Sequence, residues 1–443
     1  MTTLCFYQGL RTIGGTIVEV RTDNARCLFD FGLVYDPQID ARVLPRPDAL
    51  VYDSLKTGAL AMIDGLYDRD ELRGIPLMAY GDTEPLPFVL ISHMHIDHMG
   101  ALGLLACDMP VYTSRDGLRL YRGLQKAGEA LPRPHRGIYG VRPLQWKQMG
   151  DLGFRLIPVD HDVPGACGFE FETPDGRICY TGDLRLHGRK AEQTLAFADT
   201  VKHADVCITE GTMVSFIEDF DAVEPDADLS NSVTEPQVEQ NIVQAAKTAA
   251  GMVFINLYHR NVERVHALIK AFNAVGRRFV LQYETALLYR QFYTDESICV
   301  YAPSAGKRGM ANCDPVARDA LVDDPGRYAL DLPYEQLMDA LDFPAAECLY
   351  IHSEGVPLGA YDPGYQKLRD FLARQGIAYR AIGCGGHASP AHLKYLLTRI
   401  APGTLVPLHS YTPEKLRIPG AKQLLPEAGK RYALAGGNLT PAD

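Results

Sequence analysis

Apolar residues in the first half of the chain occur in short runs, and most of these runs end in polar residues. Runs of this length, bounded by turn residues, are typical of buried β-strands. They predict strands in TLCFYQ (3–8), GTIVEV (15–20), ARCLFDFG (25–32), PFVLI (87–91), FRLIPVDH (154–161), RICYTGD (177–183) and DVCITEGT (205–212). A long polar, proline-containing segment lies at about 35–85, and GALGLLA (100–106) suits the start of a helix.

After residue 212 the pattern changes, and stretches with helical periodicity alternate with short apolar runs. EPQVEQNIVQAAKTAAG (235–251) and VERVHALIKAFNAVG (262–276) have the periodicity of helices and end in glycine. MVFINLY (252–258) and RFVLQYE (278–284) follow them as predicted strands. This alternation predicts a parallel sheet with crossover helices. Because 443 residues exceed what one hydrophobic core usually supports, we expect two domains, or one domain with a large insertion.

Composition and charge narrow the class of protein. Hydrophobic residues make up 47% of the chain, as in ordinary globular domains, and no apolar run is long enough to predict a membrane span. The N-terminus has no apolar signal segment, and ten cysteines without a CxxC pair favour reduced, mostly buried thiols, so we expect a cytoplasmic protein. The net charge is 44 − 55 = −11, which speaks against non-specific nucleic-acid binding through overall charge.

Candidate metal ligands are concentrated in ISHMHIDHMG (91–100), directly after a predicted strand. Alternate residues of an extended segment point the same way, so His93 and His95 can bind one metal ion. Asp97 and His98, at the turn that follows, can face a second ion. Such ligands suit Zn²⁺, or Mn²⁺ where more oxygen ligands take part. The alternative interpretation is a surface loop that happens to be rich in histidine.

Two adjacent metal ions need further ligands from other parts of the chain. His161 ends FRLIPVDH, Asp183 ends RICYTGD, and His409 follows the apolar run in TLVPLHS (404–410). Each has an ordinary explanation when taken alone, because a histidine after a strand is often a hydrogen-bonded surface residue and an aspartate often forms a turn. Open α/β sheets place their sites at such strand ends, so the combination makes them candidates.

Together these motifs resemble the metallo-β-lactamase superfamily and, within it, the β-CASP nucleases, with ribonuclease J-like proteins as the nearest relatives. The resemblance extends from about residue 13 to 416. Four stretches match superfamily motifs: Asp30 in LFDFG, HMHIDH (93–98), His161 in DHDVPGACGF and Asp183 in YTGDLRLHG. Three more match β-CASP markers: Glu210 in ITEGT, His387 in GCGGHASPAHL and His409 in VPLHSYTPEKL.

The resemblance implies an α/β fold, a four-layer αββα sandwich with an inserted α/β β-CASP cap domain. The expected boundaries are 1–210 for the first part of the metallo-β-lactamase domain, 211–385 for the cap and 386–443 for the completion of the sandwich. The active site is then expected between the sandwich and the cap, and Asp30 is expected to orient the metal-binding loop.

The same resemblance implies two Zn²⁺ ions per chain, with Mn²⁺ as the alternative. One ion is expected at His93, His95, His161 and Asp183, and the other at Asp97, His98, Asp183 and His409. Asp183 would bridge them, because a carboxylate can bind both. Two such ions lower the pKa of a bridging water and stabilise an in-line phosphoryl transition state. His387 is the candidate general acid for the leaving 3′-oxygen, and Glu210 would keep it protonated.

From these features we expect a metal-dependent hydrolase that cleaves single-stranded RNA, with no membrane partner. The sequence leaves open whether the substrate is RNA, DNA or another phosphodiester, whether cleavage is endo- or exonucleolytic, and whether the protein is a homodimer. A non-catalytic subunit of an RNA-processing complex is a further alternative, although such subunits usually lose metal ligands and this set is complete.

The RNA phosphates are expected at VFINLYHRNVER (253–264), where a predicted strand ends and a helix begins. The free N–H groups at a helix N-terminus suit an anion, and Arg260 and Arg264 add formal charge. The alternative is that Arg264 pairs with acidic residues on its own helix face.

Overall fold

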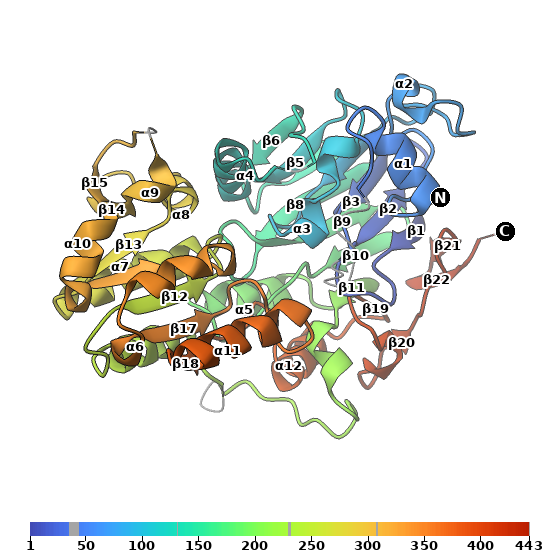
Figure 1. Cartoon of the computed structure of the whole chain (residues 1–443). Coiled ribbons are helices and arrows are strands. Elements are labelled where there is room, and N and C mark those ends of the chain that lie inside the picture. Colours follow the sequence, from blue (N-terminus) through green and yellow to red (C-terminus); the bar gives the residue numbers. More distant parts are fainter. Residues whose placement is uncertain (35–43, 131, 229–231, 307–308, 443) are drawn as a thin grey trace.

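The computed structural model describes the chain except for residues 35–43, 131, 229–231, 307–308 and 443. Its described strands form three sheets (Figure 1). The first sheet has the order β22 (Asn438–Pro441), β21 (Arg431–Ala435), β1 (Thr3–Gln8), β2 (Ile17–Arg21), β3 (Arg26–Phe29), β4 (Pro87–Leu90), β5 (Val111–Ser114) and β6 (Ile138–Val141). The second has the order β20 (Lys422–Gln423), β19 (Thr404–Leu408), β11 (Val206–Glu210), β10 (Gly176–Tyr180), β9 (Cys167–Thr173), β8 (Leu152–Pro158) and β7 (Lys147–Met149).

These two sheets pack face to face around an apolar core. Phe29 of β3 lies at the centre of it, with ring centroids 4.6 Å from Tyr180 of β10 and 5.7 Å from Phe171 of β9. Helices α1 (Leu50–Thr57) and α4 (Arg115–Ala127) pack on the outer face of the first sheet, and α5 (Ala191–Thr200) and α12 (Pro390–Ile400) on that of the second. The result is the expected αββα sandwich.

The third sheet is built from the chain between β11 and α12 and lies beside the sandwich (Figure 1). Its order is β15 (Cys313–Val316), β14 (Ile298–Tyr301), β13 (Arg278–Leu281), β16 (Tyr328–Asp331), β12 (Val253–Leu257), β17 (Leu349–Ser353) and β18 (Ala378–Ala381). All of its strand pairs are parallel, which confirms the sheet type predicted from the alternating pattern. We call this sheet and its helices the inserted unit.

The helices of the inserted unit cover both faces of its sheet. Helices α6 (Glu235–Ala246), α7 (Val262–Ala274) and α8 (Tyr283–Tyr289) pack on one face. Helices α10 (Arg318–Asp323) and α11 (Pro363–Gln375) pack on the other, and α9 (Ala302–Ala305) follows β14. Strand β11 pairs directly with β19 although about 200 residues separate them, so the chain leaves and re-enters the sandwich at neighbouring strands.

Most of the predicted elements are present, with two differences. GALGLLA contains only a 3₁₀ turn, η1 (Leu102–Leu104), which follows the one-turn helix α3 (Ile96–Met99). RFVLQYE is a strand only to Leu281, because α8 already begins at Tyr283. The expected domain boundaries at 211 and 385 stay a prediction.

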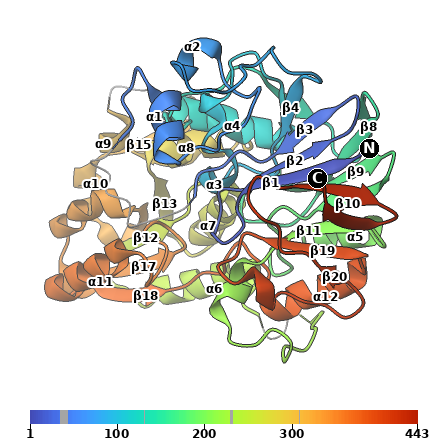
Figure 2. The same ribbon diagram turned by 90° about the vertical axis from the view of Figure 1, so that its right-hand side faces the viewer.

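The cysteines agree with the expectation of unpaired, mostly buried thiols. All ten cysteines are free, and all are buried except the exposed Cys107 and the half-buried Cys313. Among the described residues, no helix has the length and apolar character needed to cross a membrane. Strand β21 pairs with β1, so the two ends of the chain lie close together (Figure 2).

Candidate metal centre

The residues of the HMHIDH motif lie directly after β4, where the sequence placed them. His93 and His95 lie in the segment between β4 and α3, and Asp97 and His98 lie on α3. His93 and His98 are buried, whereas His95 and Asp97 keep 14% and 17% of their side chains exposed. The cluster therefore has a buried side and a side open to solvent.

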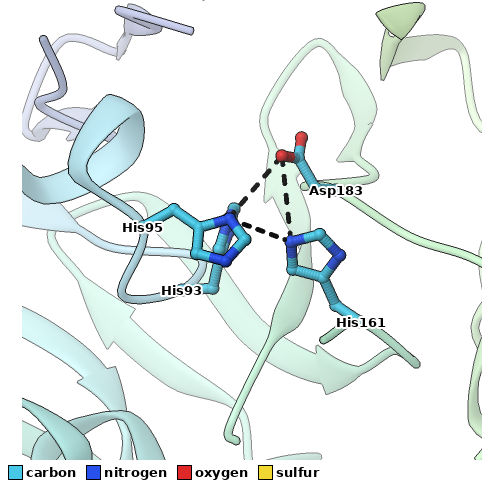
Figure 3. Close-up of side chains that lie close together, drawn as sticks. All are labelled: His93, His95, His161 and Asp183. Atoms are coloured by element: carbon cyan, nitrogen blue, oxygen red, sulfur yellow. Dashed lines mark hydrogen bonds and ion pairs between the residues drawn. The ribbon is translucent and has the colours of Figure 1, made fainter. Parts of the chain in front are cut away.

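The first group of candidate ligands consists of His93, His95, His161 and Asp183, which converge from three separate stretches of the chain (Figure 3). Asp183 Oδ2 lies 3.6 Å from His93 Nε2 and 4.0 Å from His161 Nε2. His161 Nε2 is 3.2 Å from His95 Nδ1. One ligand atom from each residue lies within 4.8 Å of the others, as a shared metal ion requires.

The second group consists of Asp97, His98, Asp183 and His409. His98 Nε2 lies 3.1 Å from both Asp183 Oδ2 and His409 Nε2, and His409 Nε2 lies 3.0 Å from Asp97 Oδ2. The two groups are the two sets expected from the sequence, and they share Asp183. The structure thus brings all the predicted ligands together, and their coordination of metal stays a prediction.

The chemistry of these atoms fits metal ions. His93 Nε2 and both carboxylate oxygens of Asp183 are buried without a hydrogen-bond partner. Burial and the neighbouring imidazoles hold the pKa of His93 well below its ordinary value, and burial holds that of His161 at about 4. Neutral imidazoles keep the lone pair that a metal needs. Buried polar atoms left without partners are costly, so ions that bind them would stabilise the fold.

Hydrogen bonds orient four of the five candidate histidines through the second ring nitrogen. The Nδ1 atoms of His93, His98, His161 and His409 lie 2.6–2.9 Å from Ser92 Oγ, Asp30 Oδ2, the Gly386 carbonyl and Thr212 Oγ1, respectively. With Nδ1 donating, Nε2 of each ring is left free for a metal. His95 instead turns Nδ1 toward His161 and places Nε2 3.1 Å from Asp162. Such partners fix ring orientation and tune metal affinity.

Asp162 is a site residue that the sequence reasoning missed. Its neighbour His161 was singled out, and Asp162 stands beside it in the same DHD stretch. The two aspartates that flank His161, Asp160 and Asp162, were a signal that could have suggested an orienting role for one of them.

Asp30 holds the HMHIDH loop in place. Its carboxylate accepts hydrogen bonds from the backbone N–H and hydroxyl of Ser92, from His98 Nδ1 and from the Tyr180 hydroxyl. It is fully buried and has a φ of 53°, a left-handed conformation that non-glycine residues adopt at a cost. These four hydrogen bonds tie β3, the loop after β4 and β10 together beneath the histidine cluster.

Two glycines allow backbone segments to approach the second group closely. A Cβ atom on Gly32 would lie 1.6 Å from the carbonyl oxygen of Asp97, and one on Gly14, which has a φ of 74°, would lie 2.2 Å from the Asp97 side chain. Only glycine fits at these positions.

His387 and Glu210 form a pair beside the two groups. His387 Nδ1 lies 3.1 Å from Glu210 Oε2 and 3.8 Å from Asp183 Oδ2. Burial alone would lower the pKa of His387, but the carboxylates of Glu210 and Asp183 outweigh burial and raise it to about 10. Glu210 also accepts hydrogen bonds from the backbone N–H groups of Leu184 and Thr212. The arrangement favours a protonated imidazole next to the metal centre.

The expected phosphate site at the start of α7 is wrong. Arg260 and Arg264 keep only 3% and 2% of their surface exposed. Arg260 donates to the Met94 carbonyl and pairs with Glu129, and His259 pairs with Glu129 as well. Arg264 pairs with Glu235, which lies on α6 and not on the same helix face. Because these guanidinium groups are buried and fully engaged, they cannot hold RNA.

Comparisons with known proteins agree with this geometry. Residues 62–239 match the family described as Beta-lactamase superfamily domain. A protein of unknown function from Enterococcus faecalis V583 is 31% identical, and its crystal structure superposes with a TM-score of 0.83, covering 97% of this chain and 99% of that one. Ribonuclease J of Thermus thermophilus is 23% identical over 211 residues, covering 45% of this chain and 35% of that protein. Ribonuclease J of Pyrococcus abyssi is 21% identical over 276 residues, covering 61% and 57%.

The sandwich, its HMHIDH loop and the domain match define a protein of the metallo-β-lactamase superfamily. Within the superfamily, the inserted parallel sheet and these relatives make the chain similar to the ribonucleases J. The chain spans less than two thirds of the length of the ribonucleases J that it matches.

Proposed function

We propose that this protein is a dinuclear metal-dependent phosphodiesterase that cleaves single-stranded RNA. One observation carries the proposal. The two ligand groups share Asp183, and the pair of His387 and Glu210 lies beside them, with His387 Nδ1 3.8 Å from Asp183 Oδ2. A hydrolase of thioesters or lactones would use the metal ligands but has no need of His387 and Glu210. The names of the relatives support RNA as the substrate.

The residues have separate roles in this proposal. Zn²⁺ or Mn²⁺ ions held by the two groups would supply Lewis acidity and lower the pKa of a water at the centre. His387 Nδ1 faces Glu210, so Nε2 is the nitrogen that can donate a proton to the leaving 3′-oxygen. Glu210 keeps the imidazole protonated and oriented. His95, Asp97 and His387 form the solvent-open side of the centre, where a phosphate can approach.

The alternatives are a hydrolase of DNA or of another phosphodiester, and a non-catalytic subunit. One assay separates them: metal-loaded protein is incubated with matched RNA and DNA strands carrying 5′-phosphate, 5′-triphosphate or internal labels. Cleavage of RNA but not DNA is expected, and the label released distinguishes endo- from exonuclease. A protein that holds both ions and cleaves neither strand would contradict the proposal.

Metal content is the first testable consequence. After reconstitution with Zn²⁺ or Mn²⁺ and removal of free metal, elemental analysis is expected to find two ions per chain. Asp97→Ala removes a ligand of the second group only, so about one ion is expected to remain, with hydrolysis lost because the water loses one of two Lewis acids. A folded protein that binds no transition metal would exclude this site.

The role of His387 gives a second test. His387→Ala is expected to keep both ions and to lower kcat by about 10²–10⁴-fold, the usual contribution of one acid–base group. Glu210→Gln is expected to lower kcat less, since the acid remains but loses its anionic partner. Loss of metal from His387→Ala would instead identify His387 as a ligand. The exposed His203→Ala serves as a control with unchanged activity.

A further inference from the structure

Two aromatic side chains stand exposed beside the metal centre. Phe216 ends the 3₁₀ helix η2 (Thr212–Phe216), which follows β11, and Tyr411 follows β19. They are 56% and 48% exposed, with ring centroids 6.4 Å apart and ring planes at 87°. An edge-to-face pair of this kind leaves ring faces open to a third ring.

Hydrogen bonds attach this pair to the second ligand group. Tyr411 lies two residues after His409, whose Nδ1 is 2.7 Å from Thr212 Oγ1 at the start of η2. The Ser215 hydroxyl lies 2.9 Å from Ser410 Oγ and accepts a hydrogen bond of 2.9 Å from the Tyr411 N–H. The two segments that carry the rings are therefore held together by the same contacts that orient His409.

The inserted unit carries a further exposed aromatic residue. Tyr361, between β17 and α11, is half-exposed. Burial raises the pKa of its hydroxyl to about 12, with Glu354, Asp362 and Tyr411 as smaller causes.

The two arginines that the sequence suggested for binding the substrate are not available for it. Arg260 and Arg264 are buried, and the exposed Arg11 pairs with Glu414. Stacking on an aromatic ring needs no cation and tolerates every base, because each nucleobase has a flat π-face. Large aromatic rings exposed as a pair beside a functional site are typical of a binding surface.

We propose that Phe216 and Tyr411 form a stacking platform for one nucleobase of a single-stranded nucleic acid, next to the phosphate that lies at the metal centre. This inference rests on the proposed nuclease function and adds a binding determinant to it. The platform selects a polynucleotide with an unpaired base over a small phosphodiester, and it sets the position of the strand without reading its sequence.

The test combines side-chain truncation with removal of single bases. Phe216→Ala and Tyr411→Ala are compared with the ring-preserving variants Phe216→Tyr and Tyr411→Phe. KM and kcat are measured on a single-stranded RNA and on a series that carries one abasic nucleotide at successive positions. Metal content is determined for every variant, so that loss of the ions is recognised.

The alanine variants are expected to raise KM about 10-fold, the scale of one base–aromatic stack, with kcat and metal content unchanged. The ring-preserving variants are expected to match the wild type. At one position of the series, the abasic nucleotide is expected to raise the wild-type KM by the same factor as the alanine substitutions do on intact RNA. On that substrate the alanine substitutions are expected to raise KM no further. The salt dependence of binding is expected to stay the same, because no phosphate contact is removed.

Two results overturn the platform: an unchanged KM in the alanine variants, or an equal loss on every abasic substrate. Either result, with RNA cleaved normally by the wild type, leaves the nuclease proposal standing. A wild-type protein that holds two ions and cleaves no nucleic acid overturns both proposals.

Discussion

Asp183→Ala is expected to remove both metal ions and to lower RNA cleavage by more than about 10⁴-fold, beyond the loss expected for a single acid–base group. Asp183 is the residue that both ligand groups share. Its Oδ2 atom lies 3.1 Å from His98, 3.6 Å from His93 and 3.7 Å from His409. Without this carboxylate, Asp97 would be the only carboxylate left in the two ligand groups.

Elemental analysis of the metal content and an RNA-cleavage assay together test this prediction. Circular dichroism establishes that the variant is folded. Asp183→Asn keeps the size of the side chain and removes its charge, and the same loss of metal is expected. Asp162→Ala is the graded control, because Asp162 contacts only His95 and His161 among the candidate ligands, and both belong to the first group. Its expected effect is a roughly 10–100-fold weaker affinity for one ion. An Asp183→Ala protein that still binds two ions would show that the groups are independent.

The ligands could be predicted from the sequence because each follows a short apolar strand. Strand ends are visible as a change from apolar to polar residues, and neighbouring strands bring their ends to the same edge of a sheet. His161, Asp183 and His409 follow β8, β10 and β19, which belong to one sheet. The partner of His95 was missed because the DHD stretch was interpreted through its histidine alone, and the contact between Asp162 and His95 is tertiary.

The segment at about 35–85, which the sequence suggested is a long polar connection, shows a second limit of prediction from the sequence. Outside residues 35–43, which the structure does not describe, it contains α1 and the one-turn helix α2 (Arg69–Leu72). Leu60, Ile63, Leu66 and Tyr67 are buried there although they lie between helices. Apolar residues on irregular backbone have no repeat of 2 or 3.6 residues, so periodicity cannot reveal that they join the core.

The error at Arg260 and Arg264 has a different cause. A helix N-terminus with two arginines has the same sequence pattern whether its cations face solvent or lie buried. The groups that decide the matter are distant in sequence: Glu129 and Met94 for Arg260, and Glu235 and the carbonyls of Ser353 and Cys384 for Arg264. Only tertiary contacts distinguish the two cases.

Glu235→Ala is expected to destabilise the protein more than any surface substitution, by about 3–5 kcal/mol in the free energy of unfolding. Glu235 begins α6 in the inserted unit, and its carboxylate lies 2.8 Å from Arg264 and 3.0 Å from Arg185, which follows β10 of the sandwich. All three side chains are about 2% exposed. Removing the carboxylate leaves Arg264 hydrogen-bonded to the neutral groups of Ser353 and Cys384, and it leaves Arg185 with its ion pair to Asp160.

Denaturant unfolding of metal-loaded wild type and variant measures the difference. Glu239→Ala is the matched control, one turn further along α6, because Glu239 pairs with Arg189 at the partly exposed surface. Such pairs contribute up to about 1 kcal/mol, so little change is expected. Equal effects of the two substitutions would mean that the buried charges are solvated or paired in another way.

The pH dependence of the free energy of unfolding tests the same prediction independently. Burial opposes ionisation of Glu235, but Arg264 and Arg185 outweigh burial and lower its pKa from 4.5 to about 2. A carboxylate whose pKa is lower in the folded state stabilises the protein above its unfolded pKa, and this stabilisation is lost as pH falls toward the folded value. The stability difference between the wild type and Glu235→Gln is therefore expected to be constant above pH 4.5 and to shrink as pH falls toward 2. At about 1.4 kcal/mol per pKa unit the full difference is about 3 kcal/mol, in line with the buried-pair scale. A difference that is independent of pH across this range would show that Glu235 stabilises α6 through packing, and not through the two arginines that join the inserted unit to the sandwich.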